Sequence, residues 1–220
     1  MALPRVKTDE ILRILEAEYP DAKCALEHRN AFELLIATIL SAQCTDKRVN
    51  EITAGLFETY NHPSRFLTLT AEQLEEEIKG CGLFKTKSRN ILATCKILMD
   101  KYNGEVPKTR EELMELPGVG RKTANVVISN AFGVPAIAVD THVQRVSNRI
   151  GLAKSEDPLQ TEQQLMKRIP KEKWSDAHHW LIYHGRQICS ARSPKCSICP
   201  LLAECRHAKQ EKVARNANIR

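Results

Sequence analysis

The chain has 220 residues, which is enough for one large domain or two small ones with a buried core. Its hydrophobic fraction of 42% and charged fraction of 27% are ordinary for a globular protein, which excludes a disordered or fibrous chain. The net charge of +6 favours a polyanionic partner. No apolar stretch of signal-peptide length opens the chain, and its most apolar run, residues 32–40, is too short to span a bilayer. We therefore expect a cytoplasmic protein with no membrane partner, associated with the nucleoid if the source is bacterial.

Apolar residues recur at intervals of three and four along almost the whole chain, with no sustained alternation, which predicts an all-α protein. In chain order, the expected helices cover residues 11–19, 32–40, 49–60, 70–78, 91–102, 109–116, 121–132, 140–150, 158–169 and 175–188. Thr70 with Gln73 and Thr109 with Glu112 have the spacing of capping boxes. The helix at 32–40 is apolar on all sides, so we expect it at the centre of a core.

A tight turn with two glycines, LPGVGRKT at residues 116–123, comes directly before one of these helices. Glycines let the backbone approach a ligand closely, and the free N–H groups of a helix start attract an anion. The turn could therefore hold a DNA phosphate. Considered alone, it is more simply explained as an ordinary connection between two helices.

Four of the eight cysteines, Cys189, Cys196, Cys199 and Cys205, have the spacing C-x6-C-x2-C-x5-C, which predicts a metal site. Four thiolates suit either a tetrahedral zinc ion or a [4Fe-4S] cluster, and the spacing does not choose between them. The other four, Cys24, Cys44, Cys81 and Cys95, are interpreted as ordinary buried thiols.

Basic residues gather around and after the metal motif. Residues 186–220 hold eight basic and two acidic side chains, which indicates either a phosphate contact or a solubilising tail.

Four segments in this order resemble the endonuclease III family of helix-hairpin-helix DNA glycosylases: LLIATILSAQCTD at 34–46, LPGVGRKTANVV at 116–127, VDTHV at 139–143 and the terminal cysteines. The match runs from about residue 8 to 207. The resemblance implies two helical domains flanking a DNA-binding cleft. One is a six-helix barrel at 24–134, with its helix-hairpin-helix at about 109–132, and the other is an iron-sulfur cluster domain built from 1–23 and 135–220.

Lys122 is expected in the first turn of its helix, where the helix dipole disfavours the ammonium form, although partial burial would be needed to make the amine more reactive. Asp140 is expected to cap the next helix. The resemblance implies that the two face each other across the cleft, with Lys122 as the nucleophile that forms a Schiff base and Asp140 as its helper. It also implies that base removal is followed by β-elimination at the abasic site.

The resemblance further implies a [4Fe-4S] cluster on the four terminal cysteines. The expected partner is double-stranded DNA containing damaged bases, above all oxidised pyrimidines, or abasic sites, bound by a monomer. The candidate DNA contacts are Gln43 and Leu83, which would enter the duplex, the hairpin residues Gly118, Gly120 and Arg121, and Lys195 in the cluster loop.

Two other functions are consistent with parts of this sequence pattern. A monofunctional adenine glycosylase would share the hairpin, the aspartate and the cluster, but Lys122 argues against it, as does the end of the sequence 15 residues after Cys205. A non-catalytic DNA-binding module would use the hairpin and the basic residues as phosphate contacts. That alternative leaves the occurrence of Lys122, Asp140 and Gln43 in one chain unexplained.

Overall fold

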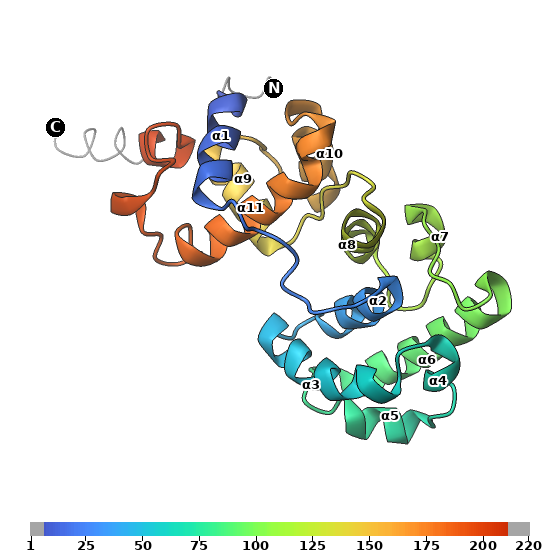
Figure 1. Cartoon of the computed structure of the whole chain (residues 1–220). Helices are drawn as coiled ribbons and strands as arrows, with labels where there is room; N and C mark the ends of the chain where they lie inside the picture. The colour runs from blue at the N-terminus through green and yellow to red at the C-terminus, as the bar shows by residue number, and fades with distance from the viewer. Residues whose placement is uncertain (1–6, 211–220) are drawn as a thin grey trace. The chain divides into compact units, whose positions relative to one another are not determined.

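The computed structural model describes residues 7–210, and every regular element in that range is a helix, as the periodicity predicted. The α-helices are α1 (Thr8–Glu18), α2 (Ala31–Leu40), α3 (Asp46–Thr59), α4 (Pro63–Phe66), α5 (Ala71–Glu77), α6 (Phe84–Tyr102), α7 (Arg110–Met114), α8 (Arg121–Phe132), α9 (Thr141–Ile150), α10 (Pro158–Arg168) and α11 (Trp174–Gln187). Two short 3₁₀ helices, η1 (Lys171–Lys173) and η2 (Cys196–Ile198), follow α10 and α11. Figure 1 shows the helices in chain order.

The chain divides into two compact units. One consists of Cys24–Val134 and holds α2 to α8. The other combines Met1–Lys23 with Pro135–Arg220, within the described range, and holds α1 and α9 to α11. Among the described helices, none is long and apolar enough to cross a bilayer.

Helix α2 forms the centre of the unit of α2 to α8. All its residues from Phe32 to Leu40 are buried, and it packs against α3, α6 and α8 (Figure 1). A helix that is apolar on every side is stable only when neighbours cover every side. The expectation that the 32–40 segment lies at the centre of a core is therefore confirmed.

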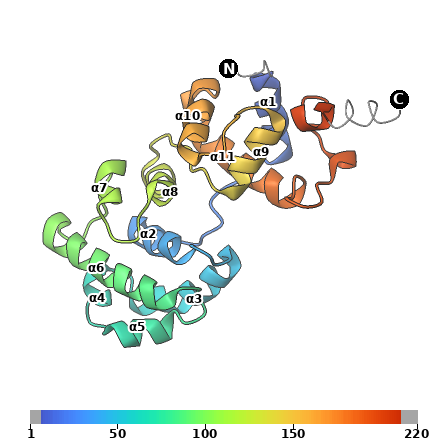
Figure 2. The same ribbon diagram turned by 180° about the vertical axis from the view of Figure 1, so that it is seen from behind.

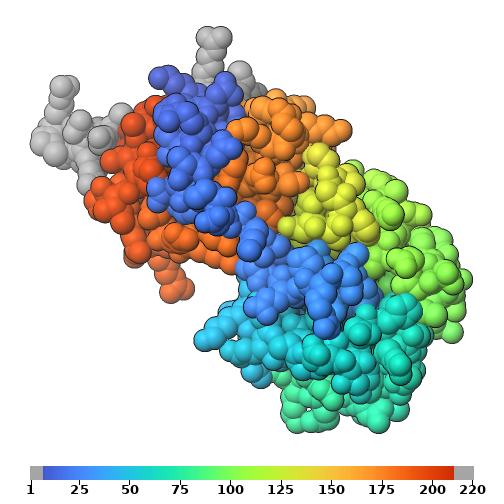
Figure 3. Space-filling view, in the orientation of Figure 1, coloured from blue at the N-terminus to red at the C-terminus, as the bar shows by residue number. Residues whose placement is uncertain are grey.

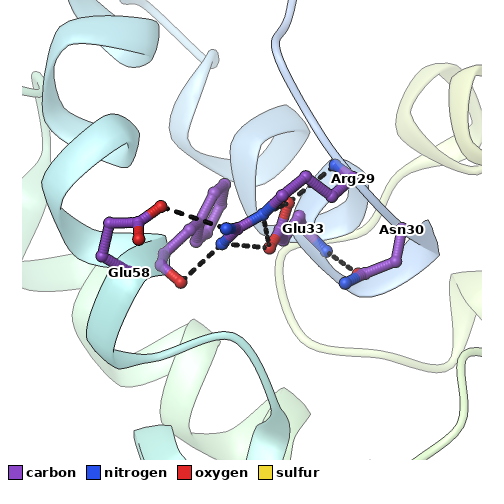
Figure 4. Close-up of polar contacts among 5 residues, drawn as sticks. Arg29, Asn30, Glu33 and Glu58 are labelled. Atoms are coloured by element: carbon purple, nitrogen blue, oxygen red, sulfur yellow. Dashed lines mark hydrogen bonds and ion pairs between the residues drawn. The ribbon is translucent and has the colours of Figure 1, made fainter.

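A network of polar contacts fixes the start of α2 against the end of α3 (Figure 4). The buried carboxylate of Glu33 accepts bonds from the Arg29 backbone N–H at 2.7 Å and from Arg29 Nε at 3.0 Å. The same guanidinium donates to the Phe57 carbonyl at 2.7 Å and to Glu58 at 3.0 Å. A buried carboxylate is tolerated only when it is paired in this way, so the network fixes the junction of the two helices.

Three details of this unit differ from the prediction. Helix α6 begins at Phe84 and not at residue 91, because its first turns precede the apolar stripe that indicated it. The four-residue helix α4 was not expected, because about one helical turn is too short for an apolar pattern to repeat. It begins after His62 with Pro63 in its first turn, and the fully buried Phe66 packs edge-on against Phe32 with ring centroids 5.5 Å apart. Helix α7 ends at Met114 rather than at residue 116, because the chain turns there and the Leu116 N–H bonds to the Leu113 carbonyl at 3.1 Å.

The unit of α1 and α9 to α11 has its own core, in which α11 packs against both α9 and α1 (Figure 2). The blue N-terminal segment therefore lies against the orange-red C-terminal segment (Figure 3). Tyr19, at the end of α1, donates or accepts a hydrogen bond at 3.0 Å with Nδ1 of His184 in α11. This bond between side chains 165 positions apart ties the two ends of the sequence into one core.

Candidate functional site

The hairpin, residues 115–120, joins α7 to α8 and is held in place by contacts with α6. Gly118 has a φ of +80°, and a Cβ at this position would lie 3.0 Å from Asn90 Nδ2. Thr94 donates a hydrogen bond to the Pro117 carbonyl at 3.0 Å. Both the backbone conformation and the close neighbour require glycine at 118.

Gly120 is the N-cap of α8, and neither backbone strain nor a close neighbour requires glycine at this position. Its φ of −90° suits any residue, and a Cβ there would meet nothing within 4 Å. Open space above a helix N-terminus lets an anion approach the first N–H groups, and the first turn of α8 holds no acidic residue that would repel it. Arg121, half-buried, and the exposed Lys122 follow directly. The sequence thus places an open helix N-terminus and two cations together at the start of α8.

Lys122 lies in the first turn of α8, as predicted, and its side chain is exposed. The partial burial that would make the amine more reactive is therefore not found in the described structure. The physical reason is that the glycine turn and the helix start face outward together. An exposed amine can reach a substrate, and only a bound substrate can then desolvate it.

Asp140 caps α9, as predicted. Its Oδ1 accepts hydrogen bonds from the backbone N–H groups of His142 and Val143, both at 2.8 Å. The carboxylate is half-buried and held against the positive end of the α9 dipole. Asp140 belongs to the unit of α1 and α9 to α11, whereas Lys122 belongs to the other unit.

Gln43 and Leu83 occupy two turns of the unit of α2 to α8, which we name the Gln43 turn (residues 41–45) and the Leu83 turn (residues 78–83). Both side chains are exposed, and Leu83 retains 56% of its accessible surface. Both backbones are left-handed, with φ of 53° at Gln43 and 58° at Leu83. An exposed leucine in a strained backbone conformation is unfavourable for folding alone, so it indicates a function.

The four terminal cysteines line a single cavity between α9, α11 and the chain that follows α11. Three contacts fix their loops: Arg149 Nη1 lies 3.5 Å from Cys189 Sγ, Cys205 Sγ lies 3.6 Å from the Arg149 carbonyl, and Cys199 Sγ lies 3.6 Å from His184 Nε2. Four thiols around one cavity, with an Arg149 N–H directed at the Cys189 sulfur, supply the type of donor that an iron-sulfur cluster takes. Within residues 7–210, no three His, Cys, Asp or Glu side chains converge as ligands of one metal ion.

Lys195 is exposed on the loop between the first two of these cysteines, and its N–H bonds to the Ile188 carbonyl at 2.9 Å. The basic residues predicted beyond it are partly outside the described range, because Lys212, Arg215 and Arg220 lie in residues 211–220.

The expectation for the other four cysteines is correct for two of them. Cys81 and Cys95 are buried, and burial raises the pKa of these thiols to about 11 and about 12. Cys24 and Cys44 are only half-buried, because each lies in a connection before a helix rather than on an apolar helix face.

Three buried charged residues were not predicted from the sequence, Glu33, Lys87 and Glu162, and Lys87 is the one cation among them. Lys87 in α6 is only 4% exposed, and it donates to two carbonyls at the end of α2. A signal was present, because Lys87 shares a helix face with Ile91, Cys95 and Leu98, all of them buried. A lysine on the apolar face of a helix indicates a specific buried partner.

Comparisons with known proteins agree with this geometry. Residues 36–171 match the family model of the HhH-GPD superfamily base excision DNA repair proteins. Endonuclease III of Bacillus subtilis is 52% identical over 193 residues, which cover 87% of this chain and 88% of the relative. Endonuclease III of Escherichia coli is 47% identical over 206 residues, which cover 94% of this chain and 98% of the relative.

The solved structure of a trapped endonuclease III–DNA covalent intermediate is 54% identical, with a TM-score of 0.89, and covers 94% of this chain and 100% of the solved chain. Both the sequence and the fold are therefore similar over almost the whole length. The chain belongs to the endonuclease III family of the HhH-GPD superfamily of base excision DNA repair proteins.

Proposed function

We propose that this base excision repair enzyme, a DNA glycosylase with abasic-site lyase activity, removes oxidised pyrimidines from double-stranded DNA by means of Lys122. Asp140 assists, and the exposed hairpin holds the DNA backbone. The observation that carries the proposal is the start of α8, where an open glycine N-cap is followed directly by Arg121 and the exposed Lys122. A phosphate bound at such a helix start would hold a neighbouring sugar within reach of the amine.

The chemistry needs one nucleophile for two steps. The neutral Lys122 amine attacks C1′ of the damaged nucleotide, the C1′–N bond breaks, and the base leaves with a proton. The C1′–O4′ bond then breaks as O4′ takes a proton, which opens the sugar ring and leaves an iminium between C1′ and Lys122. This iminium makes the C2′ proton acidic, and loss of that proton breaks the bond between C3′ and the 3′ phosphate oxygen. Asp140, a carboxylate held by two backbone N–H groups, would stabilise the positive charge that develops at the sugar.

A damaged base must leave the helical stack before it can react, which costs a few kcal/mol. Gln43 and Leu83 would enter the gap, because both side chains project from exposed turns whose left-handed backbones hold them outward. Gly118, Gly120, Arg121 and Lys195 would contact phosphates. Two solved complexes of endonuclease III with DNA, one covalent and one not, support a DNA duplex as the partner.

Cys189, Cys196, Cys199 and Cys205 would hold a [4Fe-4S] cluster in the cavity that they line. Bound there, such a cluster supplies structural cross-links and redox chemistry, and no step of the base removal passes through it. A native protein that contains zinc and lacks iron and labile sulfide would contradict this part of the proposal. Eight cysteines without a disulfide among them suit a reducing compartment, so the proposal places the enzyme in the cytoplasm as a monomer.

The experiment is a comparison of substrates. Duplexes containing thymine glycol, an abasic site, or adenine opposite 8-oxoguanine are incubated with the enzyme, and the released base and the cut strand are measured separately. We expect base release from the thymine glycol duplex and strand cleavage of both that duplex and the abasic one. Release of adenine without strand cleavage would identify a monofunctional adenine glycosylase, and binding without any reaction would identify a binding module.

A further inference from the structure

Lys87 is a buried cation that the proposed chemistry does not use. It stands in the first turns of α6, the helix that begins directly after Leu83. Its Nζ donates to the Leu40 carbonyl at 2.8 Å and to the Ala42 carbonyl at 2.7 Å. Its backbone N–H donates to the Leu83 carbonyl at 3.0 Å. One residue is therefore bonded both to Leu83 and to the residue that precedes Gln43.

The location explains why a buried ammonium is tolerated. The last carbonyls of a helix have no intrahelical partner, and they form the negative end of its dipole. Leu40 ends α2 and Ala42 follows it, so Lys87 supplies the cation and the donors that this helix end requires. Burial lowers the pKa of Lys87, and the nearby Cys81 and Cys44 thiols oppose that change.

Further contacts join the Gln43 turn to the Leu83 turn. A Cβ on Gly82 would lie 3.0 Å from the Gln43 carbonyl, so the two backbones touch. The Cys44 and Cys81 side chains, one from each turn, interact directly. Among these ties Lys87 alone brings a full charge and two short hydrogen bonds, and it does so from a rigid helix.

We propose that Lys87 is a positioning residue that fixes the spacing between Gln43 and Leu83, so that both enter the same gap in the duplex. This inference rests on the proposed function of those two side chains. Lys87 is too deeply buried to contact DNA, so it acts only through the two turns. Losing it would let two strained turns relax independently, and a misplacement of about 1 Å in positioning elements is costly for the rate.

The test replaces Lys87 with methionine, which has a similar length but no donor. Excision of thymine glycol is measured in single-turnover assays on a duplex and on a single strand, which has no stack to open. We expect Lys87→Met to slow excision from the duplex about tenfold more than excision from the single strand. The control is Lys85→Met, which removes the same charge from an exposed position two residues away and should affect both substrates equally.

Leu83→Ala provides the second half of the test, because it separates the inference from the proposed function. We expect Leu83→Ala alone to slow duplex excision selectively, and adding Lys87→Met to it to cause little further selective loss. Residues that act as one unit give such non-additive results, whereas a general loss of stability would add in full. A base analogue that fluoresces when unstacked, placed opposite the lesion, should report reduced insertion in both single variants.

Each outcome decides a different question. If Leu83→Ala is selective and Lys87→Met is not, the role of Lys87 is overturned while the proposed function stands. If neither variant is selective, Leu83 does not enter the duplex, and both the role proposed for Leu83 and the inference about Lys87 fail. Should Lys87→Met not fold, Lys87→Gln, which keeps a shorter donor, must show the same selective loss at smaller size. Equal activity of that variant on both substrates would contradict the inference.

Discussion

At the scale of single residues, the proposed chemistry depends on two side chains at helix starts, Lys122 and Asp140. Lys122 and Asp140 stand where helix-start rules placed them, one in the first turn of α8 and one as the N-cap of α9. The partial burial that a more reactive Lys122 amine would need is not found in the described residues, because exposure depends on how a turn is oriented and not on local propensity. Lys87 was missed for a similar reason, since its partners are carbonyls 45 and 47 positions away.

Asp140→Asn should separate capping from catalysis. An asparagine oxygen can accept the same two N–H bonds, so the fold should be kept, but the negative charge is lost. We expect excision of the damaged base to slow by about a hundredfold, with a nearly unchanged thermal midpoint. The measurement is single-turnover base release together with thermal unfolding.

The matched control for this variant is Asp157→Asn, because Asp157 caps α10 through a bond to the Gln160 N–H at 2.7 Å. It should leave excision unchanged. If the two variants lose activity equally, the effect of Asp140 comes from helix capping and not from its charge.

At the scale of elements, periodicity and capping predicted most of the helices. The capping box at Thr70 is present in full, with the Gln73 side chain accepting from the Thr70 N–H at 2.8 Å. Helix α4 could not be predicted, because Phe66 holds it by packing against Phe32 rather than by a repeating pattern. The hairpin was recognised from its two glycines. Only the structure shows that Gly118 is required by its positive φ and its close neighbour, whereas Gly120 leaves open space at the start of α8.

The two hairpin glycines should therefore respond differently to alanine. Gly118→Ala forces a side chain into a left-handed conformation against Asn90, so we expect a loss of about 1–2 kcal/mol in the free energy of unfolding. Gly120→Ala meets no atom and no strain, so stability should hold, while a methyl group over the α8 N-terminus should weaken DNA binding. Thermal unfolding and a binding titration on an abasic-site analogue measure both effects. Unchanged DNA affinity in Gly120→Ala would show that no phosphate binds at this helix start.

At the scale of the whole molecule, composition and charge indicated a globular protein with a polyanionic partner, whereas the assembly of each core depends on contacts far apart in sequence. The bond between Tyr19 and His184 joins residues that no local rule connects. The four cysteines were visible as a motif, but the cavity that they share depends on Arg149 from α9.

Stability should also depend on pH through a buried histidine. Burial lowers the pKa of His179 to about 4, against about 6.5 in an unfolded chain. Between these values the unfolded chain binds a proton that the folded protein does not, so the free energy of unfolding falls as the pH falls from 6.5 towards 4. The expected loss by pH 5 is about 2 kcal/mol.

Thermal midpoints of wild type and His179→Gln at pH 7 and pH 5 test this. The midpoint of the variant should fall less than that of wild type. An equal loss in both proteins would assign the acid sensitivity to other groups.

The most direct test of the account is borohydride trapping on a duplex that contains an abasic site. Borohydride reduces the Schiff base to a stable amine, which appears as a slow band on a denaturing gel. We expect a trapped band for wild type and for the control Arg121→Gln, and none for Lys122→Gln. A trapped band that persists in Lys122→Gln, or an active wild-type enzyme that gives no band, would contradict the assignment of Lys122 as the nucleophile.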